Sequence, residues 1–496
     1  MKQIVSTRTM RESDAKTIER GTSGRVLMQR AAKGIFDAYR WQGRTAIVCG
    51  SGNNAGDGYA LACLLSASGI DCQIFLLSDR FSADGAYFYG KCKEIGVKVA
   101  TFSPQESFDG YAEIVDCVFG TGFRGTPEGL FADAIRAINR SDATVISADI
   151  NSGLNGDNGL ATLAVRSDLT VSIGSYQYGH FLGQAKDLIQ DLTNVDIGIE
   201  IEGEISTLIE ANDVQPVLGT RPADCHKGNF GYVSILGGCR EYAGAIKLAS
   251  LGCAALRAGC GVAKLIIPES IYQGVSPYLL ETTAAPLPDT DGHIRFDAAR
   301  LDATLVGQRA LAIGMGWGKS PENARILEYL LKHYDIPIVI DADGLNTLAT
   351  MNLSVLQDTK CRVILTPHPK EMERLSGISV AEIRQNPVGV SMDFARKYGV
   401  TVLLKGTCTV VTDGASTHFV NRGCAGMATA GSGDVLSGIL VGLLGYAPPT
   451  ALTVAAGAWI AGRAGELAER RMNAVSMLAS DTVAEIASAI SEAIGK

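Results

Sequence analysis

The sequence lacks the features that mark several classes of protein. Lys and Arg number 44 against 52 Asp and Glu, so the chain has no positive excess for holding nucleic acid. Its first residues, MKQIVSTRTMRESDAKTIERG, are too polar for a signal peptide. The longest stretch without a charge, Val435 to Gly462, is interrupted by Pro448 and Pro449, which favours two buried helices over a membrane span. We therefore expect a cytoplasmic protein that binds neither nucleic acid nor membranes.

Cysteine spacing argues against two further classes. The 12 cysteines form no C-x-x-C pair and no pattern typical of a metal site. Most of them, such as Cys49, Cys63 and Cys253, lie in apolar segments. We interpret them as reduced core residues, with a redox role as the alternative.

The hydrophobic pattern predicts an α/β fold. Hydrophobic residues make up 46% and charged residues 19% of the 496 positions, which is typical of compact domains and not of disorder. Residues 8–40 have apolar residues at helical spacing. Short apolar runs ending in turn residues then predict a mostly parallel sheet covered by helices. These runs are residues 45–50, 71–78, 113–120, 143–150 and 168–175.

The chain divides into two predicted domains. Around residues 211–231 the periodicity lapses and Pro, Gly, Asp and Asn accumulate, so we predict domains of residues 1–212 and 213–496. The second domain is again predicted to be α/β, with a helix over 243–259 and a helical last sixty residues. Its predicted strands are residues 232–238, 262–268, 309–316, 336–344, 361–369, 400–406 and 409–414.

Polar side chains follow three predicted strands of the first half. The loop VCGSGNNAGDG supplies Asn54 and Asp57, Asp116 ends the strand EIVDCVFG, and Asp149 ends another strand and precedes Ser152. Because the carboxyl ends of parallel strands line one edge of a sheet, these loops are expected to converge on one crevice. Asn54, Asp116 and Ser152 are hard oxygen ligands suited to an alkali cation, and Asp149 suits acid–base work or a hydroxyl contact. The alternative for the glycine-rich loop is a tight strand–helix turn that uses Asn and Asp as caps.

In the second half, an acid follows small residues at the start of a predicted helix. Gly431, Ser432 and Gly433 can present successive N–H groups to phosphate oxygens. Asp434 would then lie beside the transferring phosphoryl group and accept the proton of an attacking hydroxyl. The alternative is a first-turn acid that stabilises the helix by about 1 kcal/mol.

Other strand ends of the second half carry further polar residues. Lys405 is placed where a cation can meet nucleotide phosphates. His368 lies in the turn TPHP, and hydrogen bonding within a rigid turn is its alternative role. For Asp341 and Asp343 we favour capping and turn formation over metal ligation.

The first-half motifs GSGNNAGDG, D-x-x-FGTGFRG and DINSGL resemble the epimerase domain of the NAD(P)H-hydrate repair proteins, over about residues 8–205. The resemblance implies a Rossmann-like three-layer α/β/α domain in which Asn54, Asp116 and Ser152 bind K⁺. Asn151 departs from the family pattern, which has proline before Ser-Gly, so we expect a looser turn carrying Ser152. The implied hydrate-binding positions are Asn53, Asn54, Ala55, Gly56, Asp57, Gly120, Thr121, Gly122, Phe123, Arg124, Gly125, Thr126 and Asp149.

The second half resembles the ribokinase-like superfamily, and within it the nucleotide-dependent NAD(P)H-hydrate dehydratases. The matching motifs run in the family's order over about residues 221–485 and include HKGNFGYVSILGG, VIDADGLN, LTPHPKEMERL, LLKGTCTVV and GMATAGSGDVLSG. The implied hydrate contacts are Ala245, Gly316, His368 and Asp434. The implied adenine-nucleotide positions are Lys405, Gly406, Thr407, Cys408, Thr409 and Gly433.

Together the halves resemble the fused bacterial repair enzyme. This implies epimerisation of R and S hydrates of NADH or NADPH, then dehydration of the S form with ADP or ATP as phosphate donor. K⁺ in the first domain, Mg²⁺ in the second and a homo-oligomer are also expected. The alternative is a ribokinase-like kinase for a small molecule such as a vitamin precursor, with a stable phosphoester product and a non-catalytic ligand-binding first half.

Overall fold

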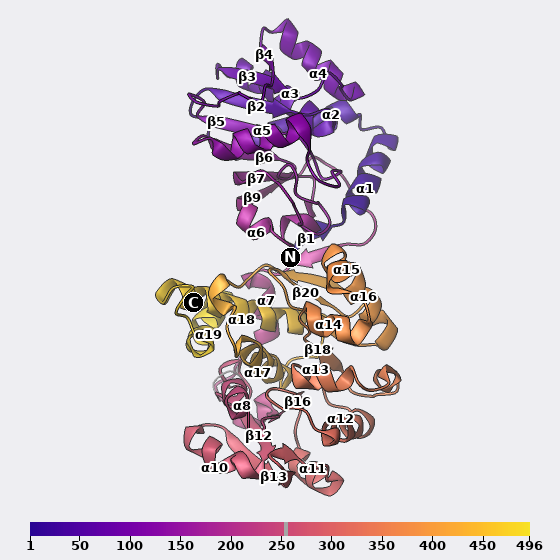
Figure 1. Cartoon of the computed structure of the whole chain (residues 1–496), viewed down its shortest axis with the longest axis vertical. Helices are drawn as coiled ribbons and strands as arrows, with labels where there is room; N and C mark the ends of the chain where they lie inside the picture. The colour runs from indigo at the N-terminus through magenta and orange to yellow at the C-terminus, as the bar shows by residue number, and fades with distance from the viewer. Residues whose placement is uncertain (252–255) are drawn as a thin grey trace. The chain divides into compact units, whose positions relative to one another are not determined.

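The computed structural model describes residues 1–251 and 256–496 (Figure 1). The described residues form two compact units, one of residues 3–206 and one of residues 207–496 together with residues 1–2. Both units are α/β, which confirms the predicted fold class. Cys253 and part of the helix predicted over 243–259 lie outside the described residues.

The first unit is built on one parallel sheet. The sheet has the strand order β4-β3-β2-β5-β6-β7-β9, and every neighbouring pair is parallel. The strands of this unit are β1 (Lys2–Val5), β2 (Thr45–Cys49), β3 (Cys72–Leu76), β4 (Lys98–Thr101), β5 (Glu113–Cys117), β6 (Thr144–Ala148), β7 (Ser167–Ile173), β8 (Tyr176–Gln177) and β9 (Ile189–Val195). Its α-helices are α1 (Thr7–Glu19), α2 (Gly24–Ala38), α3 (Asn53–Ala67), α4 (Ala83–Glu94), α5 (Gly129–Arg140) and α6 (Ala185–Leu188).

Burial of both sheet faces explains why these strands are continuously apolar. In β2, Ile47 belongs to a core shared with α2 and α3, while its neighbour Val48 belongs to a second core shared with α5. Successive side chains of a strand point to opposite faces, so a strand covered on both sides needs no polar alternation. The predicted helical arm over residues 8–40 is confirmed as two helices, α1 and α2.

The second unit has a longer, mixed sheet. From β13 to β19 the order is β13-β12-β11-β16-β17-β18-β19 and all pairs are parallel, after which β20 and β21 continue antiparallel and β10 lies beside β21. The strands of this sheet within the unit are β10 (Ser206–Leu208), β11 (Tyr232–Leu236), β12 (Val262–Pro268), β13 (Thr283–Leu287), β16 (Ala310–Ile313), β17 (Ile338–Ile340), β18 (Val363–Leu365), β19 (Thr401–Leu404), β20 (Thr409–Thr412) and β21 (Thr417–Val420). β14 (Asp289–Thr290) and β15 (His293–Ile294) form a separate antiparallel pair.

Helices cover both faces of this second sheet. They are α7 (Ala211–Leu218), α8 (Ala243–Ser250), α10 (Tyr272–Val275), α11 (Ala298–Leu305), α12 (Pro321–His333), α13 (Asp343–Leu348), α14 (Pro369–Ser376), α15 (Val380–Gln385), α16 (Pro387–Tyr398), α17 (Ser432–Leu444), α18 (Ala451–Arg471) and α19 (Ala479–Ala493). The segment 211–218, predicted to be irregular, forms α7 despite Pro216 inside it. Its buried Val214 joins a core that also contains residues of α18, so tertiary packing offsets the low helical propensity.

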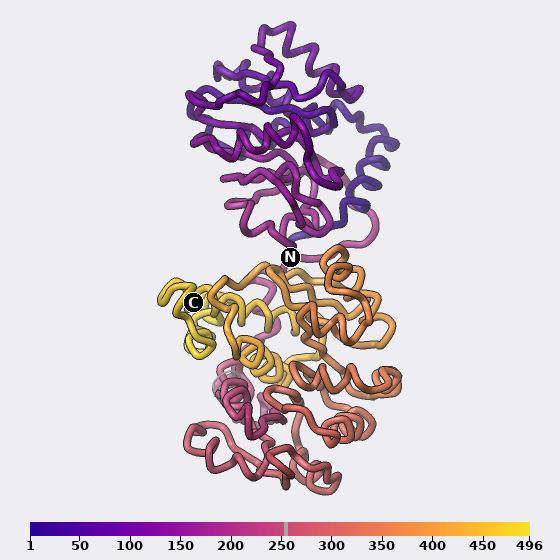
Figure 2. The backbone as a smooth tube through the Cα atoms, in the orientation of Figure 1, coloured from indigo at the N-terminus to yellow at the C-terminus, as the bar shows by residue number. Residues whose placement is uncertain are grey.

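The uncharged segment from Val435 to Gly462 forms parts of α17 and α18, as predicted, and both helices are deeply buried. Figure 2 shows α17, α18 and α19 as the yellow end of the chain, lying together. In α19, Val483 and Ile486 are buried in the same core. Among the described residues, none of the helices combines the length and hydrophobicity that a membrane crossing requires.

The expectation that Asn151 loosens the turn carrying Ser152 is wrong. Asn151 is fully buried, and its Nδ2 donates to the carbonyl oxygens of Val165 and Leu188 and to Ser167 Oγ, each at 3.0 Å. Its Oδ1 accepts a hydrogen bond from Thr170. The side chain therefore anchors the turn by hydrogen bonds that a proline could not make.

Asn151→Ala should destabilise the first unit. The substitution leaves buried partners without hydrogen bonds, at a cost of about 2–4 kcal/mol. We expect a lower midpoint for the first-unit transition in thermal or urea unfolding of the full chain, and an unchanged transition for the second unit. A first-unit midpoint equal to that of the parent protein would show that the turn is held by other contacts.

Candidate functional site

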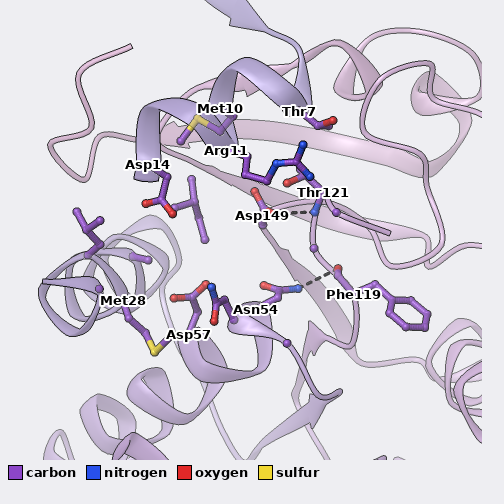
Figure 3. A pocket seen from close by; sticks show the side chains of 18 of the residues that line it. Thr7, Met10, Arg11, Asp14, Met28, Asn54, Asp57, Phe119, Thr121 and Asp149 are labelled. Carbon is purple, nitrogen blue, oxygen red and sulfur yellow. Dashed lines mark hydrogen bonds between the residues drawn. The ribbon is translucent and has the colours of Figure 1, made fainter. Parts of the chain in front are cut away.

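A cavity of about 600 Å³ lies at the carboxyl ends of β2, β5 and β6 in the first unit (Figure 3). The loop after β2, the loop after β5 and the end of β6 all contribute to it, as the strand-end argument predicts. The predicted residues that line it are Asn53, Asn54, Asp57, Gly120, Thr121, Gly122, Phe123, Arg124 and Asp149. Its described lining does not include Ala55, Gly56, Gly125 or Thr126, and a Cβ on Gly56 would lie 2.4 Å from Met28 Cε, so Gly56 serves helix packing.

Asn54, Asp116 and Ser152 lie together beneath this cavity. Ser152 Oγ donates to Asp116 Oδ1 at 2.5 Å, and the Ser152 N–H donates to Asp116 Oδ2 at 2.8 Å. Asn54 Nδ2 donates to the Phe119 carbonyl at 2.9 Å, and Ser152 Oγ lies 3.2 Å from the same carbonyl oxygen. Asn54 is 7% exposed, and its Oδ1 is buried without a hydrogen-bond partner. Burial raises the pKa of Asp116 despite the hydrogen bonds from Ser152 that oppose the shift.

Asp149 presents its carboxylate to the cavity from the end of β6. Its Oδ2 accepts the Thr121 N–H at 2.9 Å, which ties it to the glycine-rich loop after β5. Burial raises the pKa of Asp149 to about 6, although the bond from Thr121 favours the ionised form. The group therefore titrates near neutral pH, as an acid–base catalyst requires.

Helices α1 and α2 complete the cavity with residues that sequence reasoning missed. Met10, Arg11 and Asp14 of α1 and Met28 of α2 line it (Figure 3). Asp14 and Asp57 are both partly buried there, and burial together with Asp149 and Asp14 raises the pKa of Asp57 well above its ordinary value. An available signal was the position of Asp14 four residues after Met10, on the inward face of an amphipathic helix.

In the second unit, α17 begins beside two other strand ends. Gly431 has φ +95°, and a Cβ there would lie 2.4 Å from Leu248 Cδ1, so the helix start needs glycine. A Cβ on Gly433 would lie 3.5 Å from Asp341 Oδ2 and 3.6 Å from Lys405 Nζ. The helix start, the end of β17 and the end of β19 therefore meet at one point.

A buried ion pair fixes this meeting point. Lys405 Nζ lies 2.8 Å from Asp341 Oδ1 and 3.9 Å from Glu371 Oε2, and Ser437 Oγ donates to Asp341 Oδ2 at 2.8 Å. Burial alone would raise the pKa of Asp341, but Lys405 and the hydrogen bonds outweigh it and hold the pKa below its ordinary value. The expectation that Asp341 is a cap is wrong, because its carboxylate binds Lys405 and Ser437 across the fold. Asp343 does form a local contact, since its Oδ1 accepts a hydrogen bond from Asn346 Nδ2 at 3.3 Å, and its Oδ2 accepts the N–H of the distant Gly318 at 2.8 Å.

Asp434 and His368 face the same cluster. Asp434 is in the first turn of α17, where burial and then Asp341 raise its pKa to about 7, with Lys405 opposing the shift. His368 caps α14. Its ring Nδ1 accepts hydrogen bonds from the backbone N–H groups of Lys370 and Glu371, and its backbone N–H donates to Glu371 Oε2 at 2.8 Å. Burial and then Lys405 lower the pKa of His368, so the ring is neutral at physiological pH.

The other predicted positions of the second unit are divided between a pocket and the cluster. Ala245 and Gly316 line a pocket of about 580 Å³ with Tyr242 and Asp343, and a Cβ on Gly316 would lie 2.8 Å from Ala245 Cβ. Lys405 is in the cluster, and the residues from Gly406 to Thr409 follow it into β20. Cys408 is 4% exposed, so contact with a ligand there would be through its backbone.

The fold defines the chain as a Rossmann-like unit joined to a ribokinase-like unit. A family model described as NAD(P)H-hydrate dehydratase matches residues 233–488, and one described as YjeF-related protein N-terminus matches residues 24–179. Two solved structures share the fold of the second unit. They are a ribokinase-like superfamily protein from Enterococcus faecalis (TM-score 0.51, 23% identity, 59% of this chain and 97% of that one) and the ADP/ATP-dependent NAD(P)H-hydrate dehydratase of Bacillus subtilis crystallised with ATP and Mg²⁺ (TM-score 0.50, 24% identity, 58% and 99%).

Whole-length relatives identify the family. The bifunctional NAD(P)H-hydrate repair enzyme of Moorella thermoacetica is 33% identical over 92% of this chain and 90% of its own length. That of Coxiella burnetii is 32% identical over 97% and 98%. The chain belongs to the family of bifunctional NAD(P)H-hydrate repair enzymes, which unite an epimerase and a dehydratase.

The raised pKa of Asp434 predicts a stabilising substitution. A folded-state pKa of about 7 against an ordinary 3.8 means that the folded chain is progressively penalised as pH rises from 4 to 7. Asp434→Asn should therefore raise the melting temperature of the second unit by about 2–5 °C at pH 8 and much less at pH 4.5. Asp358→Asn, at an exposed site, is the control without this pH dependence. Equal effects at both pH values would contradict the electrostatic account.

Proposed function

We propose that the cluster of Asp434, Lys405 and Asp341 repairs the hydrated nicotinamide ring by phosphoryl transfer from an adenine nucleotide. Hydroxide is a poor leaving group, and phosphorylation of the ring hydroxyl makes it a good one. Elimination of phosphate then restores the dihydronicotinamide ring, and the nucleotide leaves one phosphate shorter. The observation that carries this proposal is the convergence of the glycine-rich start of α17 with the strand ends of Lys405 and Asp341.

Asp434 is the proposed base of the dehydratase. It accepts the proton of the ring hydroxyl as that oxygen attacks the terminal phosphorus of the nucleotide. The N–H groups from Gly431 to Gly433 stabilise the negative charge of the phosphoryl group during its transfer. A pKa of about 7 suits this task, because the carboxylate is substantially ionised at neutral pH yet basic enough to take a proton.

The remaining residues bind and orient. Lys405 neutralises nucleotide phosphates next to the helix start, and the backbone from Gly406 to Thr409 borders the nucleotide. Ala245, Gly316 and His368 hold the hydrate so that its hydroxyl lies between Asp434 and the phosphate. ADP and ATP are both accepted as donors in this proposal, since each ends in a phosphoryl group.

A divalent cation fits the charge balance of this cluster. Three carboxylates, those of Asp341, Glu371 and Asp434, lie around the ammonium group of Lys405. Asp341 and Glu371 are the side chains that would hold Mg²⁺ arriving with the nucleotide. When bound, Mg²⁺ neutralises phosphate charge.

The cavity of the first unit is the proposed epimerase site, so that both epimers reach the stereospecific dehydratase. The hydroxyl-bearing ring carbon adjoins the ring nitrogen, whose lone pair can expel the hydroxyl once it is protonated. Water then adds to the opposite face and returns a proton to the protein. Asp149 is our candidate for this proton exchange, because its pKa of about 6 allows it to give and take protons near neutral pH.

The oxygen cluster beneath the cavity fits K⁺. Asn54 Oδ1 is a buried acceptor without a partner, beside the Phe119 carbonyl, the Ser152 hydroxyl and the Asp116 carboxylate. Such a set of hard oxygens with one negative charge suits an alkali cation. When bound, K⁺ supplies a fixed positive charge that orders these loops.

We further propose that residues 1–212 carry the epimerase activity and residues 213–496 the dehydratase activity, and that the protein acts in the cytoplasm.

Asp434→Asn should abolish repair while nucleotide binding survives. We expect the rate of dehydration of the S hydrate to fall about 1,000-fold, and the dissociation constant for ADP or ATP to change less than about threefold. In the parent protein kcat/KM should rise with pH through about 7. The assay follows recovery of dihydronicotinamide absorbance and release of free phosphate. A phosphorylated hydrate as stable end product, or near-parental repair by the variant, would refute the mechanism.

K⁺ should stabilise the first unit selectively. Replacing K⁺ by tetramethylammonium should slow epimerisation and lower the melting temperature of the first unit, because a ligand bound only to the folded state stabilises it. Asn54→Ala should remove the dependence on K⁺. Asn139→Ala, which also removes a hydrogen-bonded asparagine from this unit, is the control that retains it. A K⁺ dependence unchanged in Asn54→Ala would exclude this site.

A further inference from the structure

Asp149 is held in an uncommon backbone conformation. Its φ is +64°, in the left-handed region that residues with a side chain rarely adopt. The N–H of Ile150 donates to the Ala148 carbonyl at 2.8 Å and closes a three-residue turn centred on Asp149. A γ-turn with positive φ at its centre is the rarer and more strained form. Something must therefore hold this residue in place.

The side chain of His180 binds the carbonyl oxygen of Asp149. His180 belongs to a 3₁₀ turn over Tyr178–His180, and its Nε2 lies 2.8 Å from the Asp149 carbonyl oxygen. The ring is 3% exposed and packs edge-on against Tyr176 and Phe181. It thus reaches the back of the acid from a segment about thirty residues further along the chain.

The second ring nitrogen fixes the tautomer. His180 Nδ1 accepts the backbone N–H of Gln177 at 3.0 Å, so it must carry a lone pair and not a proton. Nε2 therefore carries the proton and donates it to the Asp149 carbonyl. Burial lowers the pKa of His180 to about 4, which agrees with a neutral ring.

We propose that His180 is a positioning residue of the epimerase, which locks the strained turn so that the Asp149 carboxylate points into the cavity. The N–H of Asp149 donates to Val171, its Oδ2 accepts from Thr121, and its carbonyl accepts from His180. The first two bonds hold the N–H and the carboxylate of Asp149. The peptide between Asp149 and Ile150 is held within the turn by the Ile150 N–H bond to Ala148, and His180 fixes its carbonyl oxygen from outside the turn. His180 itself does not line the cavity among the described residues, so it acts through Asp149. The inference rests on the proposed role of Asp149.

The size of the effect follows from geometry. A displacement of about 1 Å of a catalytic group can cost about 100-fold in rate. We therefore expect His180→Phe, which keeps the ring but removes both nitrogens, to lower kcat for epimerisation about 10- to 100-fold. KM should change less than about threefold, because the cavity wall is intact.

The experiment measures epimerisation of purified R hydrate by the full chain without nucleotide, with two companion variants. His180→Gln keeps an amide donor and should recover most of the lost kcat. Tyr178→Phe removes a hydroxyl from the same 3₁₀ turn without touching Asp149 and should retain parental kcat. Nucleotide-dependent dehydration of the S hydrate should be unchanged in all of them and reports an intact second unit. Should His180→Phe fail to fold, His180→Asn, whose amide is too short for the Asp149 carbonyl, replaces it.

A double-mutant cycle separates the inference from the function on which it rests. Asp149→Ala should lower kcat for epimerisation more than it raises KM, and His180→Phe should cause no further loss in that background. Parental epimerisation by Asp149→Ala would overturn the proposed role of Asp149. A loss in Asp149→Ala with parental kcat in His180→Phe, or an equal loss from His180→Phe in both backgrounds, would overturn the positioning role alone.

Discussion

The buried ion pair between Lys405 and Asp341 is the contact on which the second site depends. Neither charge could remain there alone, since an unpaired buried charge costs about 3–5 kcal/mol. The pair joins the end of β17 to the end of β19, and Ser437 extends it to α17. The start of α17 is thereby fixed next to a cation, with Asp434 one residue beyond its last glycine. Burial raises the pKa of Asp434, and the carboxylate that secures Lys405 raises it further while Lys405 opposes the shift, so the ion pair fixes the position of the proposed base and adjusts its proton affinity.

In the first unit, the buried charge of Asp116 is compensated by hydrogen bonds and, among the described residues, not by a paired lysine. Asp116 is fully buried, and hydrogen bonds from Ser147, Ser152 and Val118 compensate its charge. Adjacent to it, Asn54 Oδ1 has no partner, and Asp149 sits in a strained turn. Unsatisfied and strained groups of this kind concentrate at functional sites, where binding of a ligand or ion compensates for them. The two units thus share a principle, in which parallel strand ends collect charged groups that no single strand could hold.

Much of this arrangement could be predicted from local pattern. Continuous apolar runs predict the parallel strands, because strands covered on both faces have no polar alternation. The uncharged stretch after Asp434 predicts the two buried helices. Other elements could not be predicted. Pro216 and the surrounding turn residues predict irregular structure where helix α7 is found. The helix forms because Val214 is buried against α18. Asn151 was expected to weaken a turn that it anchors, because its four hydrogen-bond partners come from Val165, Ser167, Thr170 and Leu188.

The sequence by itself determined the fold class, the family resemblance and the loops that carry chemistry, because these depend on residue type and on spacing within a short segment. Only the tertiary structure decided which distant residues complete each site. Arg11 and Asp14 reach the first cavity from a helix more than a hundred residues before Asp149, and Asp341 proved to be a partner of Lys405 and not a cap. The physical reason is that burial, charge pairing and backbone strain are properties of the surroundings in space, which no local run of residues contains.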